Sequence, residues 1–329
     1  MHTDVSYLGF HLPHPFIAGA SPFGHQIDTI KRLEDAGWAA VVLHSLFEEQ
    51  ITAAKDGRIR HMDPLDPKFA QKLAHFPASD DYALSPDAYA EHISRVKQSV
   101  KIPIIGSLNG TSPESWLRFA RIIEQAGADA LELNLYEVVG DLTTSASAIE
   151  ATFATIVGNV KRLVRIPVAV KVLPYFTAFG DMARQLDEAG ADALVLFNRF
   201  YQADIDITTM KVRSQVALST NSELLLRLRW LAILHGRIRP NLALTGGVAV
   251  PDDGIKAILA GADVVQMVSA LLRHGPTYLD TMRGGLHRWM ESHKLDTLDD
   301  VRGKASLQRS DPTAVERAAY LHTLQSWGR

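Results

Sequence analysis

The chain has 329 residues, no cysteine, and a net charge of −3 from 34 basic and 37 acidic side chains. This near balance of charge argues against nucleic-acid or membrane-surface binding. The absence of cysteine excludes disulfides, thiolate metal sites, cysteine-ligated iron–sulfur clusters and a cysteine nucleophile on this chain.

No linker or low-complexity tract divides the sequence, so we expect a single domain over residues 1–329. The first residues lack the features of a secretory signal. No apolar run approaches the length needed to cross a bilayer. We therefore expect a cytoplasmic protein.

Eight segments are predicted as short buried strands. In chain order they lie within residues 15–21, 36–45, 101–108, 126–135, 165–174, 189–198, 241–247 and 260–269. Four of them carry near copies of one phrase: AGWAAVVLHS, AGADALELNL, AGADALVLFN and AGADVVQMVS. The Gly of each copy suits the left-handed cap that ends a helix, and the bounded apolar run behind it suits a strand buried on both faces. Each copy therefore predicts a corner between a helix and a strand.

Helix-like stretches such as ESWLRFARIIEQ and FGDMARQLDE separate these strands, with apolar residues three or four apart. Eight alternating strand and helix units predict an α/β protein, a closed (β/α)8 TIM barrel. An open doubly wound sheet is the alternative, but no GxGxxG motif follows any strand. Long loops are expected after strand 2 (46–82) and strand 6 (199–222), the second with a short hairpin. Loops of this length are commonly lids or subunit contacts.

Chemistry in a TIM barrel is carried by the carboxyl ends of the strands. Polar residues that a packed core would not favour lie at these ends: Ser21, His44, Ser45, Asn109, Asn134, Lys171, Asn198, Arg199 and Ser269. Their distribution around the barrel predicts one site at its mouth.

Lys171 lies in VAVKVLP, where strand alternation directs it into the barrel with Ala169. A buried ammonium needs a counter-charge or gives up its proton. Three roles are open from the residues alone. The first is a structural ion pair with Glu132. The second is that of a Schiff-base nucleophile, and the third is that of a fixed cation facing the negative charge of a reduced cofactor.

The glycine pair Gly246–Gly247 follows strand 7, and Ser269 follows strand 8. These are the loops in which such barrels most often hold a phosphate, and glycine N–H groups approach an anion closely. Asparagine amides at the ends of strands 3, 4 and 6 fit a planar ring rich in N–H and C=O groups. Phosphate, ring and lysine together predict flavin mononucleotide, FMN, as the cofactor.

The sequence resembles the dihydroorotate dehydrogenase family over most of its length, from PFIAGAS to LDTLDDVRGKAS. ELN at 132–134 resembles its strand-4 motif, VAVKVLP its strand-5 motif with the flavin lysine, LTGGV and QMVSALLRHGP its phosphate segments, and VRGKAS its C-terminal helix ending. The resemblance implies an FMN-dependent oxidoreductase acting on CH–CH groups, with a link to pyrimidine metabolism. Hydride would pass between flavin N5 and a small dihydro or unsaturated substrate, such as a carboxylated heterocycle.

Residue by residue, the expected cofactor contacts are Gly19, Ala20, Ser21, His44, Ser45, Asn109, Asn134, Lys171, Asn198, Ser219, Thr220, Gly246, Gly247, Ser269 and Ala270. The expected substrate contacts are Asn109, Asn134, Asn198 and Arg199, with Tyr201 as a further aromatic contact. Lys171 is expected among the catalytic residues.

The sequence also departs from the family pattern. The family places a Cys or Ser base after its strand-4 Asn, whereas this chain reads NLYEVVGD, so the base position falls at Glu137 and a substrate Asn position at Val139. The family lysine after strand 2 is His44 here. We therefore predict Tyr136 or Glu137 as the acid/base, and a substrate other than dihydroorotate.

The expected partners are a small-molecule substrate, a second copy of the chain and, as an open option, a redox subunit. No nucleic-acid or membrane partner is expected, and no metal site, because the histidines lack ligand spacing. Two other functions stay open from the sequence. One is a Schiff-base aldolase or lyase using Lys171. The other is a non-catalytic flavin-binding barrel, which the missing Cys or Ser base leaves open.

Overall fold

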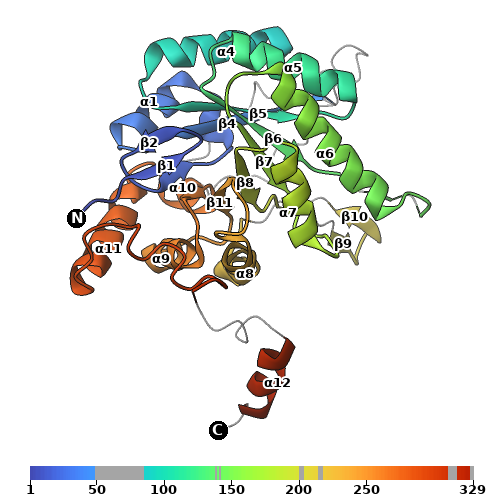
Figure 1. Ribbon diagram of the computed structural model, residues 1–329. Coiled ribbons are helices and arrows are strands. Elements are labelled where there is room, and N and C mark those ends of the chain that lie inside the picture. Colours follow the sequence, from blue (N-terminus) through green and yellow to red (C-terminus); the bar gives the residue numbers. More distant parts are fainter. Residues whose placement is uncertain are drawn as a thin grey trace.

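A closed barrel of eight parallel strands forms the centre of the molecule, with helices arranged around it (Figure 1). The computed structural model describes residues 1–48, 85–137, 139–140, 142–199, 204–213, 218–309 and 317–326. The barrel strands, in spatial order, are β11 (Asn241–Thr245), β12 (Val264–Met267), β3 (Phe16–Ala18), β4 (Val41–Phe47), β5 (Ile104–Asn109), β6 (Ala130–Leu135), β7 (Val168–Val172) and β8 (Ala193–Leu196). The predicted TIM barrel is therefore confirmed, and the open sheet is excluded.

The described helices follow the strands in the expected alternation. They are α1 (Ile27–Asp35), α4 (Pro86–Ser99), α5 (Pro113–Gln125), α6 (Ala146–Leu163), α7 (Phe179–Glu188), α8 (Leu224–Leu234), α9 (Pro251–Ala260), α10 (Ser269–His274), α11 (Tyr278–Ser292) and α12 (Arg317–Ser326), with 3-10 turns η1 (Pro22–Gly24) and η2 (Asn221–Glu223). Figure 1 draws α12 apart from the barrel. Among these helices, none is both long enough and apolar enough to cross a membrane.

The repeated phrase forms the predicted corners. Gly37, Gly127, Gly190 and Gly261 lie just past the ends of α1, α5, α7 and α9, with φ of +88°, +95°, +96° and +116°. These values lie in the left-handed region, which glycine enters without a Cβ penalty. The apolar runs that follow become β4, β6, β8 and β12, whose central residues are buried.

Each helix covers the barrel with an apolar stripe. In α5, Trp116, Phe119 and Ile123 are buried at spacings of three and four. The side chain of Ser112 accepts a hydrogen bond from the backbone N–H of Ser115 at 3.3 Å, which caps the first turn. Burial of each such large apolar side chain contributes about 1.5–3 kcal/mol.

An N-terminal hairpin closes the amino-terminal end of the barrel, and the sequence did not predict it. It consists of β1 (Val5–Tyr7) and β2 (Phe10–Leu12), paired antiparallel. The backbone N–H of Leu8 donates to Oδ1 of Asn241, the first residue of β11, at 3.0 Å. Strands of three residues carry too short a pattern to be recognised by alternation.

The two predicted long loops have different outcomes. After strand 2, β4 continues to Phe47, two residues into the loop expected at 46–82, and residues 49–84 lie outside the described part. The hairpin expected within 199–222 is confirmed as β9 (Asp204–Asp206) paired with β10 (Lys211–Arg213). Tyr201 lies outside the described residues.

Candidate functional site

A cavity of about 370 Å³ opens at the carboxyl ends of the barrel strands. The residues that line it are Ala20, Ser21, Pro22, His25, His44, Ser45, Phe47, Asn109, Asn134, Tyr136, Lys171, Asn198 and Arg199. Most of the polar residues expected at strand ends are therefore brought together. The strand 7–8 residues form a separate group, described below.

Lys171 faces this cavity and is paired at its base. Its Nζ lies 3.3 Å from Oε1 of Glu132, and the Glu132 side chain is fully buried. The ion pair considered from the sequence is thus present, in a residue that also lines the cavity. The carboxylate supplies the counter-charge that a buried ammonium needs, which fits a fixed cation better than the neutral amine required for a Schiff base.

Asn134 is oriented by the neighbouring strands. It lies opposite Lys171 in the β6–β7 register. Its Nδ2 donates to Oγ of Ser107 at 2.9 Å and to the carbonyl of Leu108 at 3.2 Å, while Ser107 Oγ and Ser45 Oγ are 2.8 Å apart. Because the side-chain N–H groups of Asn134 are hydrogen-bonded to barrel strands, its Oδ1 faces the cavity. There Nδ2 of Asn198 approaches this oxygen at 3.5 Å.

His44 stands where the resembling family has a lysine, and its environment keeps it neutral. The pKa of His44 is lowered to about 3, first by burial and then by the neighbouring His25 and His92, while a hydrogen bond to the carbonyl of Gly24 opposes the shift. The rings of His44 and His25 stack at 3.7 Å between centroids. The buried Nε2 of His44 has no hydrogen-bond partner among the described residues. This edge of the cavity therefore presents a neutral imidazole ring in place of a second cation.

The residues expected to hold a phosphate converge beside the cavity. Gly247 N donates to Ser219 Oγ at 3.2 Å, and Ser219 N donates to Ser269 Oγ at 3.0 Å. The two hydroxyls are 2.7 Å apart. Side chains at the glycines are excluded, because a Cβ would lie 2.8 Å from Arg227 Nη2 at Gly246 and 2.7 Å from the backbone N of Leu224 at Gly247. Closely spaced N–H and O–H donors in a glycine cradle fit the chemistry of a phosphate group.

The other expected cofactor contacts lie around these groups. Gly19 packs against Val268, and a Cβ at Gly19 would lie 2.8 Å from Cγ2 of that residue. Ala270 is buried at the start of α10. Thr220 is exposed, and its hydroxyl is 2.7 Å from that of Ser222. A cofactor contact from Thr220 would therefore be made by a side chain that is exposed to solvent.

The substrate-side candidates are more open to solvent. Tyr136 is half-buried and lines the cavity, whereas Glu137 is exposed and is not among the lining residues. Arg199 also lines the cavity, with its Nη2 3.6 Å from Glu223 Oε1 and its side chain 41% exposed. Arg199 therefore both forms a surface ion pair and lines the cavity.

Sequence reasoning missed several residues of the site. Ser107 holds Asn134, His25 stacks on His44, and Gln266 donates from Nε2 to Glu132 Oε2 at 2.8 Å. Ser107 and Gln266 lie inside predicted strands, and strand alternation does mark positions that face the barrel. The sequence does not indicate which polar groups, on which strands, come into contact when the barrel closes.

The family model described as dihydroorotate dehydrogenase matches residues 85–290. The chain belongs to the dihydroorotate dehydrogenase family. The matched segment contains the barrel strands β5, β6, β7, β8, β11 and β12, together with the paired lysine and the glycine cradle.

Individual relatives cover more of the chain. A putative dihydroorotate dehydrogenase A (fumarate) of Aeropyrum pernix is 31% identical over 219 residues, 65% of this chain and 71% of the relative. A dihydroorotate dehydrogenase B (NAD(+)) catalytic subunit of Thermoplasma volcanium is 26% identical over 92% of this chain and 99% of its own. The NAD-dependent dihydropyrimidine dehydrogenase subunit PreA of Escherichia coli is 22% identical over 92% and 76%.

Membership in the dihydroorotate dehydrogenase family makes the chain an oxidoreductase of the class that acts on CH–CH groups. The family assignment agrees with the resemblance stated from the motifs. The family assignment does not identify the substrate or the role of any individual residue. The geometry of the site bears on both.

Proposed function

We propose that the chain is an FMN-dependent oxidoreductase that transfers a hydride between flavin N5 and a small dihydro or unsaturated substrate, such as a carboxylated heterocycle. One observation carries the proposal. Lys171, paired with buried Glu132, faces a cavity that also receives asparagine side chains from three strand ends. A fixed cation with planar amide partners is suited to a ring that gains negative charge on reduction.

The residues present fit FMN at both of its ends. Gly246, Gly247, Ser219 and Ser269 would hold the phosphate, since the N–H and hydroxyl groups of Gly247, Ser219 and Ser269 lie close together and the two glycines carry no side chain of their own. Asn134 and Lys171 would contact the ring. When bound, the flavin supplies hydride acceptance and return at N5. The chain's own residues supply its orientation, a matched charge and partial exclusion of water.

For proton transfer we propose Tyr136, with Glu137 as the second candidate. Tyr136 lies in the cavity lining next to Asn134, so its hydroxyl can reach a bound substrate, whereas Glu137 would have to turn inward from an exposed position. Arg199, at the open side of the cavity, is suited to a substrate carboxylate. Asn109, Asn134 and Asn198 would supply further substrate contacts.

We propose a substrate other than dihydroorotate. The family base and substrate Asn positions fall on Glu137 and Val139, both exposed, and the family lysine after strand 2 is replaced by neutral His44. The half of the cavity that would contact substrate therefore presents different chemistry. The link to pyrimidine metabolism stays a prediction.

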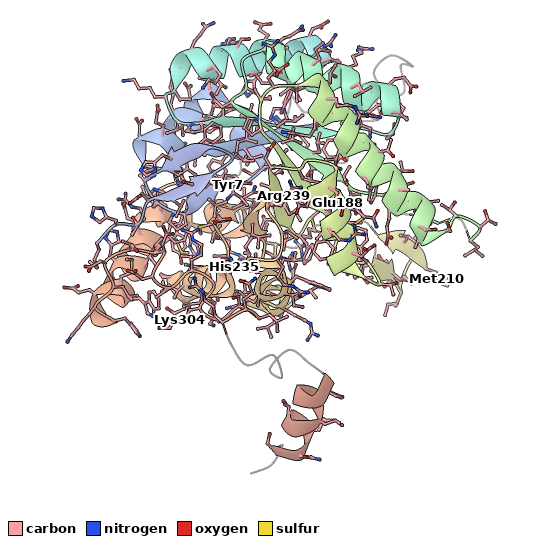
Figure 2. The ribbon with its side chains drawn as sticks, viewed as in Figure 1. Tyr7, Glu188, Met210, His235, Arg239 and Lys304 are labelled. Atoms are coloured by element: carbon pink, nitrogen blue, oxygen red, sulfur yellow. The ribbon has the colours of Figure 1, made fainter. Side chains whose placement is uncertain are left out.

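Partners are proposed from the relatives and from one surface. Two of the relatives are named as a catalytic subunit and as subunit PreA, which supports a partner subunit that carries electrons. The β9–β10 hairpin exposes Ile205, Ile207, Met210 and Val212, each more than 65% exposed, and Met210 lies at its outer tip (Figure 2). We propose this hairpin as a contact for a second copy of the chain, in a cytoplasmic protein.

The first test is the visible spectrum of the purified protein, with identification of any released chromophore. A yellow protein that releases FMN in near-stoichiometric amount supports the proposal. A colourless protein that takes up no added FMN contradicts it. Trapping of a Lys171 adduct by borohydride would then point to the Schiff-base alternative.

A pair of lysine variants localises the flavin. Lys171→Ala should lose FMN or bind it at least tenfold more weakly, since the fixed cation is removed. Lys161→Ala is the matched control, because Lys161 also forms an ion pair, with Asp192, but on the outer surface of the barrel. Equal FMN affinity in the two variants would exclude Lys171 from the flavin site.

A further inference from the structure

A chain of buried polar side chains runs through the barrel interior below the cavity. Lys171 Nζ contacts Glu132 Oε1 at 3.3 Å, and Glu132 Oε2 accepts a hydrogen bond from Gln266 Nε2 at 2.8 Å. Glu132 and Gln266 are at most 1% exposed. One carboxylate oxygen of Glu132 thus contacts Lys171, on the cavity side, and the other contacts Gln266, away from the cavity.

Tyr7 of the N-terminal hairpin lies at the lower end of this chain. It is fully buried, and it lies near the centre of the molecule in Figure 2. Burial raises the pKa of Tyr7 well above its usual value, the charge of Glu132 raises it further, and the side chain of Gln266 opposes the rise. Glu132 and Gln266 thus both act on the Tyr7 hydroxyl.

Two atoms of this region lack hydrogen-bond partners of standard geometry in the described part of the chain: the hydroxyl of Tyr7 and Oε1 of Gln266. One is a donor and the other an acceptor. Leaving a buried polar group unpaired is unfavourable, so the Tyr7 hydroxyl and Gln266 Oε1 suit one another as donor and acceptor. A hydrogen bond between them would hold the Gln266 amide with its N–H group toward Glu132, the orientation in which Nε2 donates to Glu132 Oε2.

We propose that Tyr7 and Gln266 are positioning residues that act on Lys171 through Glu132, and so couple the N-terminal hairpin to the electrostatics of the flavin site. This inference rests on the proposed function for its readout at the flavin. Gln266 neutralises part of the negative charge on Glu132, and without it Glu132 would draw the Lys171 ammonium away from the cavity. The effective positive charge at the flavin ring would then fall.

The experiment uses the FMN-loaded protein and three variants: Gln266→Leu, Tyr7→Phe and, as the control, Thr3→Val. Thr3 belongs to the same N-terminal segment and donates to the carbonyl of Pro13 at 3.1 Å, so its variant weakens this segment without touching the polar chain. The measurements are the midpoint potential of the bound FMN and its affinity for sulfite, which adds to flavin N5 and leaves a negative charge on the ring.

We expect Gln266→Leu to bind sulfite about tenfold more weakly, the loss that corresponds to one hydrogen bond to a charged group. Its midpoint potential should become more negative. Tyr7→Phe, two contacts further away, should show a smaller shift in the same direction, and Thr3→Val none. Equal shifts in Tyr7→Phe and Thr3→Val, or no shift in Gln266→Leu, would overturn the inference.

A second measurement needs no flavin and separates this inference from the proposed function. A double-mutant cycle on denaturant unfolding compares Tyr7→Phe, Lys171→Met and the double variant. Coupling through Gln266 and Glu132 predicts that the effects on the unfolding equilibrium constant differ from additivity by more than about twofold. Simple additivity would overturn the coupling even in a protein that binds FMN, and non-additivity would support it in one that does not.

Discussion

The two sides of the cavity differ in how firmly their polar groups are held. On the cofactor side, Lys171, Asn134 and Ser219 are buried and each is fixed by neighbouring strands or loops. On the substrate side, Tyr136 is half-buried, and Glu137 and Arg199 are exposed. The first arrangement suits a resident group that is held in one orientation. The second suits a ligand that enters and leaves, and it is also the side on which the chain departs from the family motif.

The sharpest test of this difference is Tyr136→Phe. Loss of an acid/base group slows a reaction by about 10²–10⁴-fold, so this variant should keep its FMN and lose turnover with any substrate that reduces the wild-type protein. Glu137→Gln is the comparison. A loss confined to Glu137→Gln would transfer the role to Glu137, and loss of FMN from Tyr136→Phe would break the division between the two sides.

Burial of His44 in the wall of the cavity should make the stability of the protein depend on pH. The pKa of His44 is about 3 in the folded protein, where burial is the main cause, against 6.5 in the unfolded chain. Above pH 6.5 the ring is neutral in both states. As the pH falls below 6.5 the unfolded chain binds the proton first, so stability is lost until about pH 3. The loss from His44 at pH 5 is on the order of 2 kcal/mol.

Unfolding of wild type and His44→Phe at pH 7 and pH 5 measures this contribution. The variant should lose less stability than wild type over that interval, whatever its stability at pH 7. His14, whose pKa burial lowers to about 4, leaves a residual dependence in both proteins. Identical pH dependence in the two would remove His44 as its source.

Gly247→Ala tests the cradle at the phosphate end. The residue has φ +81°, and a Cβ would lie 2.7 Å from the backbone N of Leu224, so the loop must shift. We expect FMN to bind about tenfold more weakly, a loss of about 1.4 kcal/mol, with riboflavin, which lacks the phosphate, little affected. Gly180→Ala is the control, because a Cβ at that position would meet no atom within 4 Å. Equal losses for FMN and riboflavin would place the phosphate elsewhere.

The smallest stability effect is expected at Arg199. Its ion pair with Glu223 spans 3.6 Å at a partly exposed site, and such pairs contribute about 0–1 kcal/mol. Arg199→Ala should therefore unfold like wild type while raising KM for a carboxylated substrate. A larger loss of stability, with KM unchanged, would assign Arg199 to the scaffold.

Much of the fold was predictable because it depends on local chemistry repeated along the chain. The glycine corners and bounded apolar runs mark strands such as β6 and β12 without any knowledge of what packs on them. The β1–β2 hairpin was not predictable in this way, since three-residue strands leave no period to detect. Residues 49–84 were predicted as a loop and lie outside the described residues.

The candidate site was predictable in part for the same reason. Position at a strand end pointed to Lys171 and Asn134, and the structure brings both to one cavity. The contacts that fix them, from Ser107 and Gln266, join strands far apart in sequence. A polar residue inside a strand signals that it needs a partner, but its identity is decided only when the barrel closes. The single domain over 1–329 stays a prediction.

Closure of the barrel also has a consequence for how the chain folds. β3 pairs with β12, aligning Phe16 with Val265, and Leu8 is held by Asn241 across 233 positions of sequence. During synthesis the first strand and the hairpin before it leave the ribosome long before these partners exist. Contacts of such long range make folding slow. This segment, made well before its partners, is therefore among the last to reach its place, and the polar chain ending at Tyr7 is completed only then.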